Sequence, residues 1–173
     1  MDNRLDKPLW AAAAATFEHL GFLLAEPEPG ADGPGSDGPP PGNGDPPGGG
    51  GGGAWWTDAP RASVGFRGPV HGHLALWVSP EVARSVAGTM LASDAPDEAL
   101  VADTLGELSN VICGNVLQHL AGPDGEFILS PPDPGTAPGP EAGRPEAEAR
   151  MALGPGRARV CLFVSPPGEG ARP

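Results

Sequence analysis

The chain has 173 residues and a net charge of −12, from 22 acidic and 10 basic side chains. The basic residues form no cluster, so binding to nucleic acid or to an anionic membrane surface is not expected. No apolar run approaches the ~20 residues of a membrane-spanning helix, and the N-terminus lacks the pattern of a signal peptide. We therefore expect a cytoplasmic protein.

Glycine and proline are concentrated in two stretches, and their totals of 28 and 24 are about two and three times average usage. Residues 27–53 show no apolar period and are predicted to be a disordered insertion. Residues 131–149 are also rich in Pro, Gly, Ala and Glu. The remainder, about 120 residues, suits one domain. Its parts are an N-terminal helix within 1–26, the main body at 54–166 and a flexible tail at 167–173.

The chain before residue 60 contributes one helix and a pair of tryptophans. Residues 8–25 are predicted to be helical, because apolar side chains recur there at helical spacing: Trp10, Phe17, Leu20 and Leu24. Trp55–Trp56 follow the insertion. We expect them either to form a sticky patch for a partner or to cover the edge of the core where the chain re-enters the domain.

A strand pair and a second helix follow. Residues 62–78 are predicted to form two strands, because apolar residues alternate on both sides of a break at Gly68–Pro69. Residues 79–92 are predicted to form the helix, with Ser79 as its N-cap and Pro80 in its first turn.

The third predicted helix is the longest and spans residues 97–121, from Asp97 to a stop at Gly122–Pro123. Residues 126–130 and 157–165 are predicted to be strands. The order is therefore a helix, two strands, two helices, and two or three strands. This order is typical of an α+β fold, in which helices pack on a mostly antiparallel sheet.

A helical wheel divides the third helix into an apolar face and a polar face. The apolar face holds Val101, Leu105, Leu108, Ile112 and Val116. The polar face holds Asp103, Glu107, Asn110, Gly114 and Gln118. A carboxylate and an amide three residues apart, Glu107 and Asn110, thus share one surface. On spacing alone, this pair also fits an ordinary solvated helix face.

Three further residues of this helix need an explanation. Gly114 follows Asn110 by one turn, and glycine inside a helix costs roughly 1 kcal/mol relative to alanine. A glycine is reasonable there if the backbone of another protein comes close. Asn115 and His119 fall nearer the apolar face. We expect them to be satisfied inside the fold or at a junction between helix and sheet.

Two other groups of residues could carry chemistry. His71 and His73 alternate on a predicted strand and could share a face, but no third metal ligand is nearby in sequence. The other reading places them in solvent or at a turn. Cys113 and Cys161 each lie in an apolar run, outside any Cys/His cluster, so we expect two buried free thiols.

Residues 102–115, ADTLGELSNVICGN, resemble the signature helix of the CheC/CheX/FliY family, in which Glu-x-x-Asn is followed closely by Gly-Asn. Glu107, Asn110, Gly114 and Asn115 occupy these places. The preceding segment, VGFRGPVHGHLALWVSPEVARSVAGTML, resembles the strand–turn–strand–helix unit of the family. One signature helix is present, which is closer to CheX than to the duplicated CheC.

The resemblance implies a single CheC/CheX-like domain that hydrolyses the aspartyl phosphate of a CheY-type response regulator in chemotaxis or another two-component pathway. It implies that Asn110 positions the attacking water and that Glu107 pairs with the regulator's active-site lysine. The regulator would hold the Mg²⁺, so no cofactor or metal site is expected in this chain. Partner binding is assigned to Asp103, Gly114 and Gln118.

Two further expectations follow from the same resemblance. CheX-like proteins pair through their sheets, so a homodimer is expected. The same fold can also serve as a non-catalytic module that docks on a receiver domain or a signalling scaffold. The presence of both Glu107 and Asn110 favours the enzyme.

Overall fold

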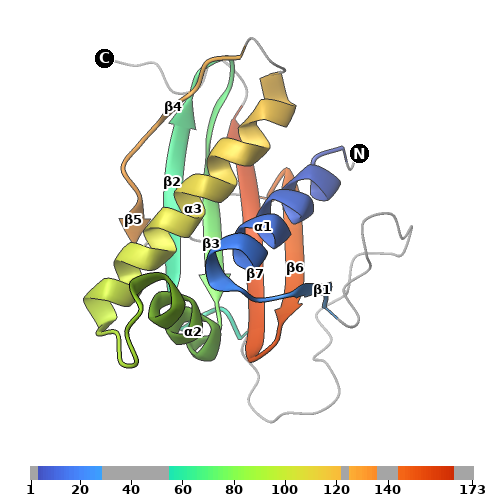
Figure 1. Cartoon of the computed structure of the whole chain (residues 1–173). Helices are drawn as coiled ribbons and strands as arrows, with labels where there is room; N and C mark the ends of the chain where they lie inside the picture. Colours follow the sequence, from blue (N-terminus) through green and yellow to red (C-terminus); the bar gives the residue numbers. More distant parts are fainter. Residues whose placement is uncertain (1–3, 29–54, 122–124, 136–143, 166–173) are drawn as a thin grey trace.

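The computed structural model describes residues 4–28, 55–121, 125–135 and 144–165. Within these residues, three helices cover one face of a seven-stranded sheet (Figure 1). The helices are α1 (Asp6–Gly21), α2 (Pro80–Leu91) and α3 (Glu98–Ala121). The strands are β1 (Ala25–Pro27), β2 (Arg61–Arg67), β3 (His71–Val78), β4 (Ile128–Leu129), β5 (Asp133–Pro134), β6 (Ala147–Leu153) and β7 (Gly156–Ser165). The predicted α+β class is confirmed.

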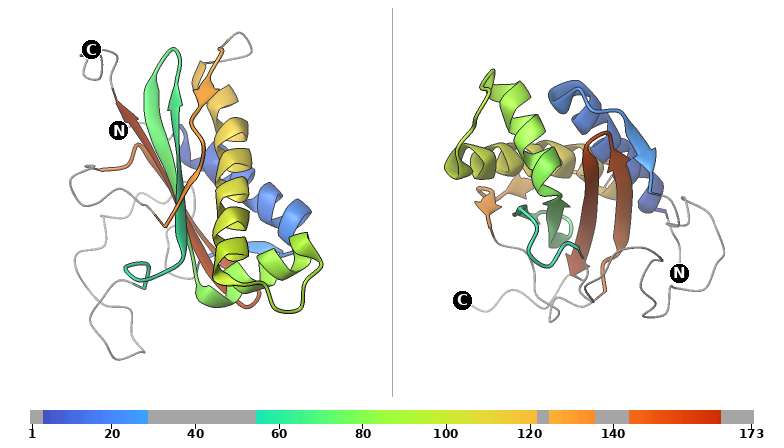
Figure 2. Two further views of the ribbon diagram at one scale, coloured as in Figure 1. Left: turned by 90° about the vertical axis from the view of Figure 1, so that its left-hand side faces the viewer. Right: turned by 90° about the horizontal axis from the view of Figure 1, so that it is seen from below.

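The sheet runs in the order β1-β6-β7-β3-β2-β4, and β5 also pairs with β2. Each pairing is antiparallel. Figure 2 shows the two layers edge-on, with the helices on one side of the sheet. Because side chains alternate across a strand, every second residue of β2, β3, β6 and β7 faces the helices and forms the main core.

The first helix ends earlier than the sequence predicts. α1 stops at Gly21, and Phe22 takes a left-handed conformation with φ 51° while its N–H bonds to the carbonyl of Phe17. The chain then turns back along the sheet as β1, so Leu24 is exposed rather than part of the helical face. The predicted insertion therefore begins inside a strand at Pro27, and from residue 29 onward it lies outside the described residues.

The central segment follows the prediction closely. β2 and β3 form the expected hairpin around Gly68–Pro69, and α2 starts at Pro80. Ser79 occupies the N-cap position, but its hydroxyl makes no capping bond. Instead, the Ser79 Oγ accepts a hydrogen bond from the backbone N–H of Arg157, 3.3 Å away, and so ties the start of α2 to β7.

The C-terminal half departs most from the prediction. Four strands follow α3, where two or three were expected, and neither β5 nor β6 lies in a segment predicted to be a strand. The strand predicted at 126–130 is only two residues long. β6 lies partly within the segment 131–149 that we had set aside, yet it pairs with β7 along its whole length. The predicted helix stop at Gly122–Pro123 and the tail at 167–173 lie outside the described residues.

The tryptophan pair lies on the outer face of the sheet, away from the helices, and both residues are half-buried where the described chain resumes at residue 55. Trp56 packs against a second apolar cluster that includes Trp77 and Cys161. The guanidinium carbons of Arg159 and Arg150 lie 4.3 and 5.4 Å from the centre of the Trp56 ring. Such cation–π contacts stabilise the two partly buried guanidinium groups.

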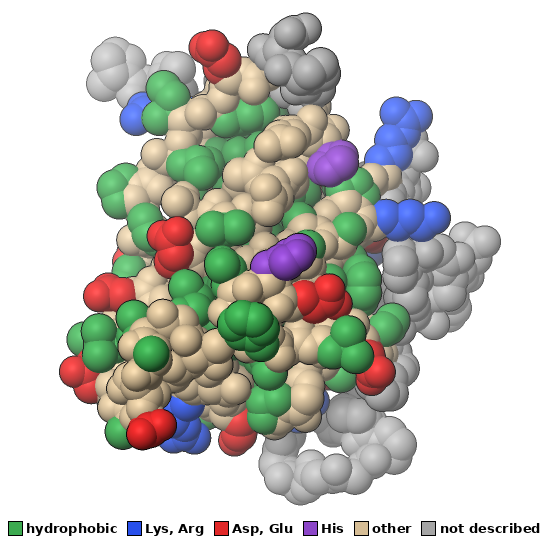
Figure 3. All heavy atoms as spheres, viewed as in Figure 1, with side chains coloured by type: hydrophobic (Ala, Val, Ile, Leu, Met, Phe, Trp, Pro, Cys, Tyr) green, Lys and Arg blue, Asp and Glu red, His purple; other side chains and the backbone are tan. Residues whose placement is uncertain are grey.

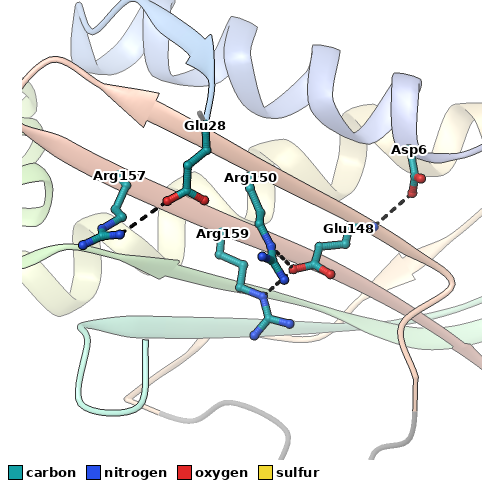
Figure 4. Close-up of polar contacts among 6 residues, drawn as sticks. All are labelled: Asp6, Glu28, Glu148, Arg150, Arg157 and Arg159. Carbon is teal, nitrogen blue, oxygen red and sulfur yellow. Dashed lines mark hydrogen bonds and ion pairs between the residues drawn. The ribbon is translucent and has the colours of Figure 1, made fainter. Parts of the chain in front are cut away.

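Glu148 joins the same arginines on the outer face (Figure 4). Its carboxylate accepts hydrogen bonds from the Nε atoms of Arg150 and Arg159 at 2.6 and 2.7 Å. Burial acts to raise the pKa of Glu148, but the hydrogen bonds and charges of the two arginines outweigh it. The pKa of this carboxyl group therefore lies below its ordinary value of 4.5.

This pairing predicts an acid-sensitive contribution to stability. A carboxylate whose folded-state pKa is lowered stabilises the fold above its unfolded pKa. That contribution should be complete above about pH 4.5 and lost as the pH falls through the lower folded value. The free energy of unfolding, measured by urea titration across this range, should fall less steeply in Glu148→Gln than in the original protein. Equal slopes would show that the pair contributes no pH-dependent stability.

Candidate functional site

The candidate site lies on α3, whose inner side is firmly packed. The predicted apolar residues Leu105, Leu108, Ile112 and Val116 are all buried, and Val101 is half-buried. The helix packs on α1, α2 and the strands β2 and β3. This packing fixes the direction in which the opposite, solvent-facing side of α3 points.

The N-terminal end of α3 and one of its flanks are also held in place. The Asp97 carboxylate accepts a hydrogen bond from the Leu100 N–H at 2.8 Å, as expected of an N-cap. The buried hydroxyl of Ser109 donates to the Leu105 carbonyl at 2.8 Å. At Gly106, an added Cβ would lie 3.0 Å from the Cβ of Pro132. The segment joining β4 to β5 therefore packs tightly against the helix next to Glu107.

The predicted polar residues share the outer side of α3. Asp103, Glu107 and Gln118 are exposed, and Asn110 and Gly114 are half-buried. Among the described residues, the side chains of Glu107 and Asn110 make no hydrogen bond or ion pair. Both groups are therefore available to a partner, on a helix that is itself held in place.

Gly114 has no packing reason to lack a side chain in the part of the chain that the structure describes. A Cβ built there would meet nothing within 4 Å. Since glycine weakens a helix interior, its presence one turn from Asn110 calls for an explanation outside these contacts. The open space is where another backbone could approach α3.

A hollow of about 270 Å³ lies beside the Glu107 side chain, between α1 and α3, with one residue of α2 at its margin. Figure 3 looks onto this face of the molecule. Asn115 lines the hollow and is exposed, and His119 is also exposed, so our expectation that they are enclosed in the fold is wrong. The hollow could not be predicted from the sequence, because its lining residues come from three separate helices.

The other candidate residues belong to the core or to the outer face of the sheet. His73 stacks on Phe163, with ring centres 4.6 Å apart, so it is not a solvated residue, and burial lowers its pKa. Cys113 and Cys161 are buried free thiols as predicted, and burial raises the pKa of each to about 12. The described residues contain no group of three potential metal ligands. No described helix has the length and apolarity needed to cross a bilayer.

The family model for the chemotaxis phosphatase CheX matches residues 61–152, which is more than half of the chain and includes all of α3. The chain belongs to the CheX family. The resemblance recognised in the signature helix is thereby confirmed. A comparison with curated protein sequences finds no match.

Solved structures agree with this CheX-family assignment at the level of the fold. The chain resembles a CheX from Desulfovibrio desulfuricans, with 17% identity, a TM-score of 0.62, and coverage of 93% of this chain and 99% of that one. It resembles the CheX–CheY–BeF3–Mg complex from Borrelia burgdorferi, with 19% identity, a TM-score of 0.63, and coverage of 92% and 97%. A CheC-like protein from a Shewanella species shows 16% identity, a TM-score of 0.62, and coverage of 96% and 100%.

Proposed function

We propose that this chain hydrolyses the aspartyl phosphate of a CheY-type receiver domain. The observation that carries the proposal is the outer side of α3, where Glu107 and Asn110 lie one turn apart and make no hydrogen bond to the described chain. Membership of the CheX family supports it, as does the existence of a complex between the B. burgdorferi CheX and CheY.

Asn110 is proposed to position the attacking water. The water oxygen attacks phosphorus, the bond from phosphorus to the aspartyl oxygen breaks, and inorganic phosphate and a free carboxylate leave. An amide has both a donor and an acceptor, so it can orient a water without taking its proton. That proton leaves with the phosphate product. Phosphoryl transfer demands mainly such positioning and charge stabilisation, which a fixed amide on a packed helix can supply.

Glu107 is proposed to pair with the active-site lysine of the receiver. A carboxylate that reaches a cation across an interface fixes the register of the two proteins more than it adds affinity. In this register Asn110, on the same side of the helix, faces the phosphoryl group. The Mg²⁺ of the reaction is assigned to the receiver, and no cofactor is assigned to this chain.

The remaining surface of α3 is proposed to complete the contact with the partner. Asp103 and Gln118 lie a turn or more to either side of the central pair, and the open space at Gly114 leaves room for the partner's backbone. The sheet-paired homodimer and the cytoplasmic location expected from the sequence remain predictions.

A second function, a docking module without catalysis, is favoured by one observation. The hollow beside Glu107 gives this face a shape that a partner could fill whether or not the partner is dephosphorylated. The two functions differ in what happens after binding, so a rate measurement separates them.

The test is the loss of phosphoryl label from a phosphorylated CheY-type receiver in Mg²⁺, with and without this protein. The original protein should accelerate the loss over the spontaneous rate. Glu107→Ala and Asn110→Ala should bring the rate back toward the spontaneous rate. Each substitution removes one proposed functional group, a carboxylate or an amide, and leaves the helix unchanged. Binding without acceleration by any of the three proteins would identify a docking module instead.

A further inference from the structure

The hollow beside the candidate site has mainly apolar walls. Its apolar side chains come from α1, α2 and α3: Ala15, Leu20, Met90 and Val111. Its volume of about 270 Å³ exceeds the roughly 150 Å³ of a protein cavity that can hold a benzene molecule. The hollow therefore has room for one large apolar side chain.

The polar side chains of the hollow do not make it a polar site. The Thr16 hydroxyl is already bonded to the Ala12 carbonyl at 2.8 Å inside α1. His19 and Asn115 are exposed. Glu107 also lines the hollow and is at the same time half of the proposed catalytic pair. An occupant of the hollow would thus lie directly against the group that is proposed to set the register of the partner.

We propose that this hollow is the socket for a large aromatic or aliphatic side chain of the receiver domain. This inference rests on the proposed function and extends it from chemistry to recognition. A receiver that places its lysine on Glu107 must cover that carboxylate, and its surface then continues over the adjoining hollow. Buried apolar anchors dominate the affinity of many interfaces, and Met90 can adapt its shape to such an anchor.

Charge argues against a second copy of this chain as the occupant. Each copy carries a net charge of −12, the exposed Glu107 lines the hollow, and the exposed Asp103 lies one turn away on α3. Apposing two such faces would bring like charges together. The lysine and Mg²⁺ proposed for the receiver's active site would instead complement Glu107.

The test is to fill the socket from within. In Ala15→Phe the added ring should occupy the hollow without changing Glu107 or Asn110. Affinity for the receiver loaded with BeF3 and Mg²⁺ is measured by calorimetry, and kcat and KM are measured with the phosphorylated receiver. We expect Kd and KM to rise at least about tenfold, with kcat within about twofold of the original protein.

Two further variants keep the test sharp. Ala11→Phe places the same ring one turn earlier on α1, at an exposed alanine that does not line the hollow, and it should leave Kd and KM unchanged. Val111→Thr keeps the shape of the wall but replaces one methyl group with a hydroxyl. It should weaken binding by about threefold to tenfold. Thermal unfolding of each variant establishes that it is folded.

The failure of this proposal differs from the failure of the proposed function. Unchanged affinity in both Ala15→Phe and Val111→Thr would overturn the socket, even if Asn110→Ala abolishes hydrolysis. Weaker binding in both variants would support the socket, even if the original protein does not dephosphorylate the receiver. A self-association measured by sedimentation that Ala15→Phe abolishes, together with unchanged receiver affinity, would assign the hollow to a second copy.

Discussion

Replacing Asn110 with alanine should reduce kcat for dephosphorylation by about a hundredfold or more, the usual cost of losing one positioned group that acts in the transition state. Binding of the receiver should change little, because in the proposed reaction Asn110 orients the water rather than holds the partner. The measurement is single-turnover loss of phosphate from the bound receiver. His119→Ala, at an exposed residue of the same helix with no proposed part in the reaction, should leave kcat unchanged.

Asn110→Asp sharpens this prediction. The two side chains have almost the same shape, but an ionised carboxylate accepts hydrogen bonds and donates none. It would also place a negative charge beside the phosphoryl group. Its kcat should therefore be at least as low as that of the alanine variant. Near-normal hydrolysis by Asn110→Asp would show that the amide donor has no part in the reaction and would contradict the proposed role.

The second large effect concerns stability. Phe17 is fully buried in α1, at the core between the helices and the sheet. Phe17→Ala should lower the free energy of unfolding by about 3–5 kcal/mol, since it removes apolar burial and leaves a cavity. For a chain of this size the melting temperature should fall by roughly 10 °C. Urea titration and thermal unfolding followed by circular dichroism measure both quantities.

Phe22 provides the matched control, because it lies just after the same helix and is 79% exposed. Phe22→Ala should change the free energy of unfolding by no more than about 0.5 kcal/mol. Comparable losses in the two variants would mean that burial in the main core is not what makes Phe17 important.

The sequence predicts the elements whose boundaries carry local signals. The hairpin of β2 and β3 has its break at Gly68–Pro69, α2 begins at Ser79–Pro80, and α3 begins after Asp97. The polar side of α3 could be predicted as well, because a helical period alone shows that Glu107 and Asn110 share a face.

The missed elements lack such signals. β6 consists of Ala, Glu, Arg, Met and Leu, which favour helix over strand when taken alone. It is a strand because β1 and β7 pair with its two edges. The end of α1 was missed for a related reason, since Phe22 takes a left-handed conformation that usually favours glycine.

The error at Asn115 and His119 has a structural cause. The buried side of α3 is shifted toward Gly106 and Cys113, and Pro132 packs against the helix at Gly106. Asn115 consequently lies on the open side that faces α1. A helical wheel gives relative angles only, so it could not show which neighbour covers which part of the helix.

The two walls of the hollow have different positions in the chain. α3 lies inside the segment that matches the family model, whereas α1 precedes it. Under our proposals, the rate of hydrolysis depends on α3 and the choice of receiver depends partly on α1. Related phosphatases in one cell could therefore diverge in the first helix and avoid cross-talk between signalling pathways, while each keeps the same chemistry.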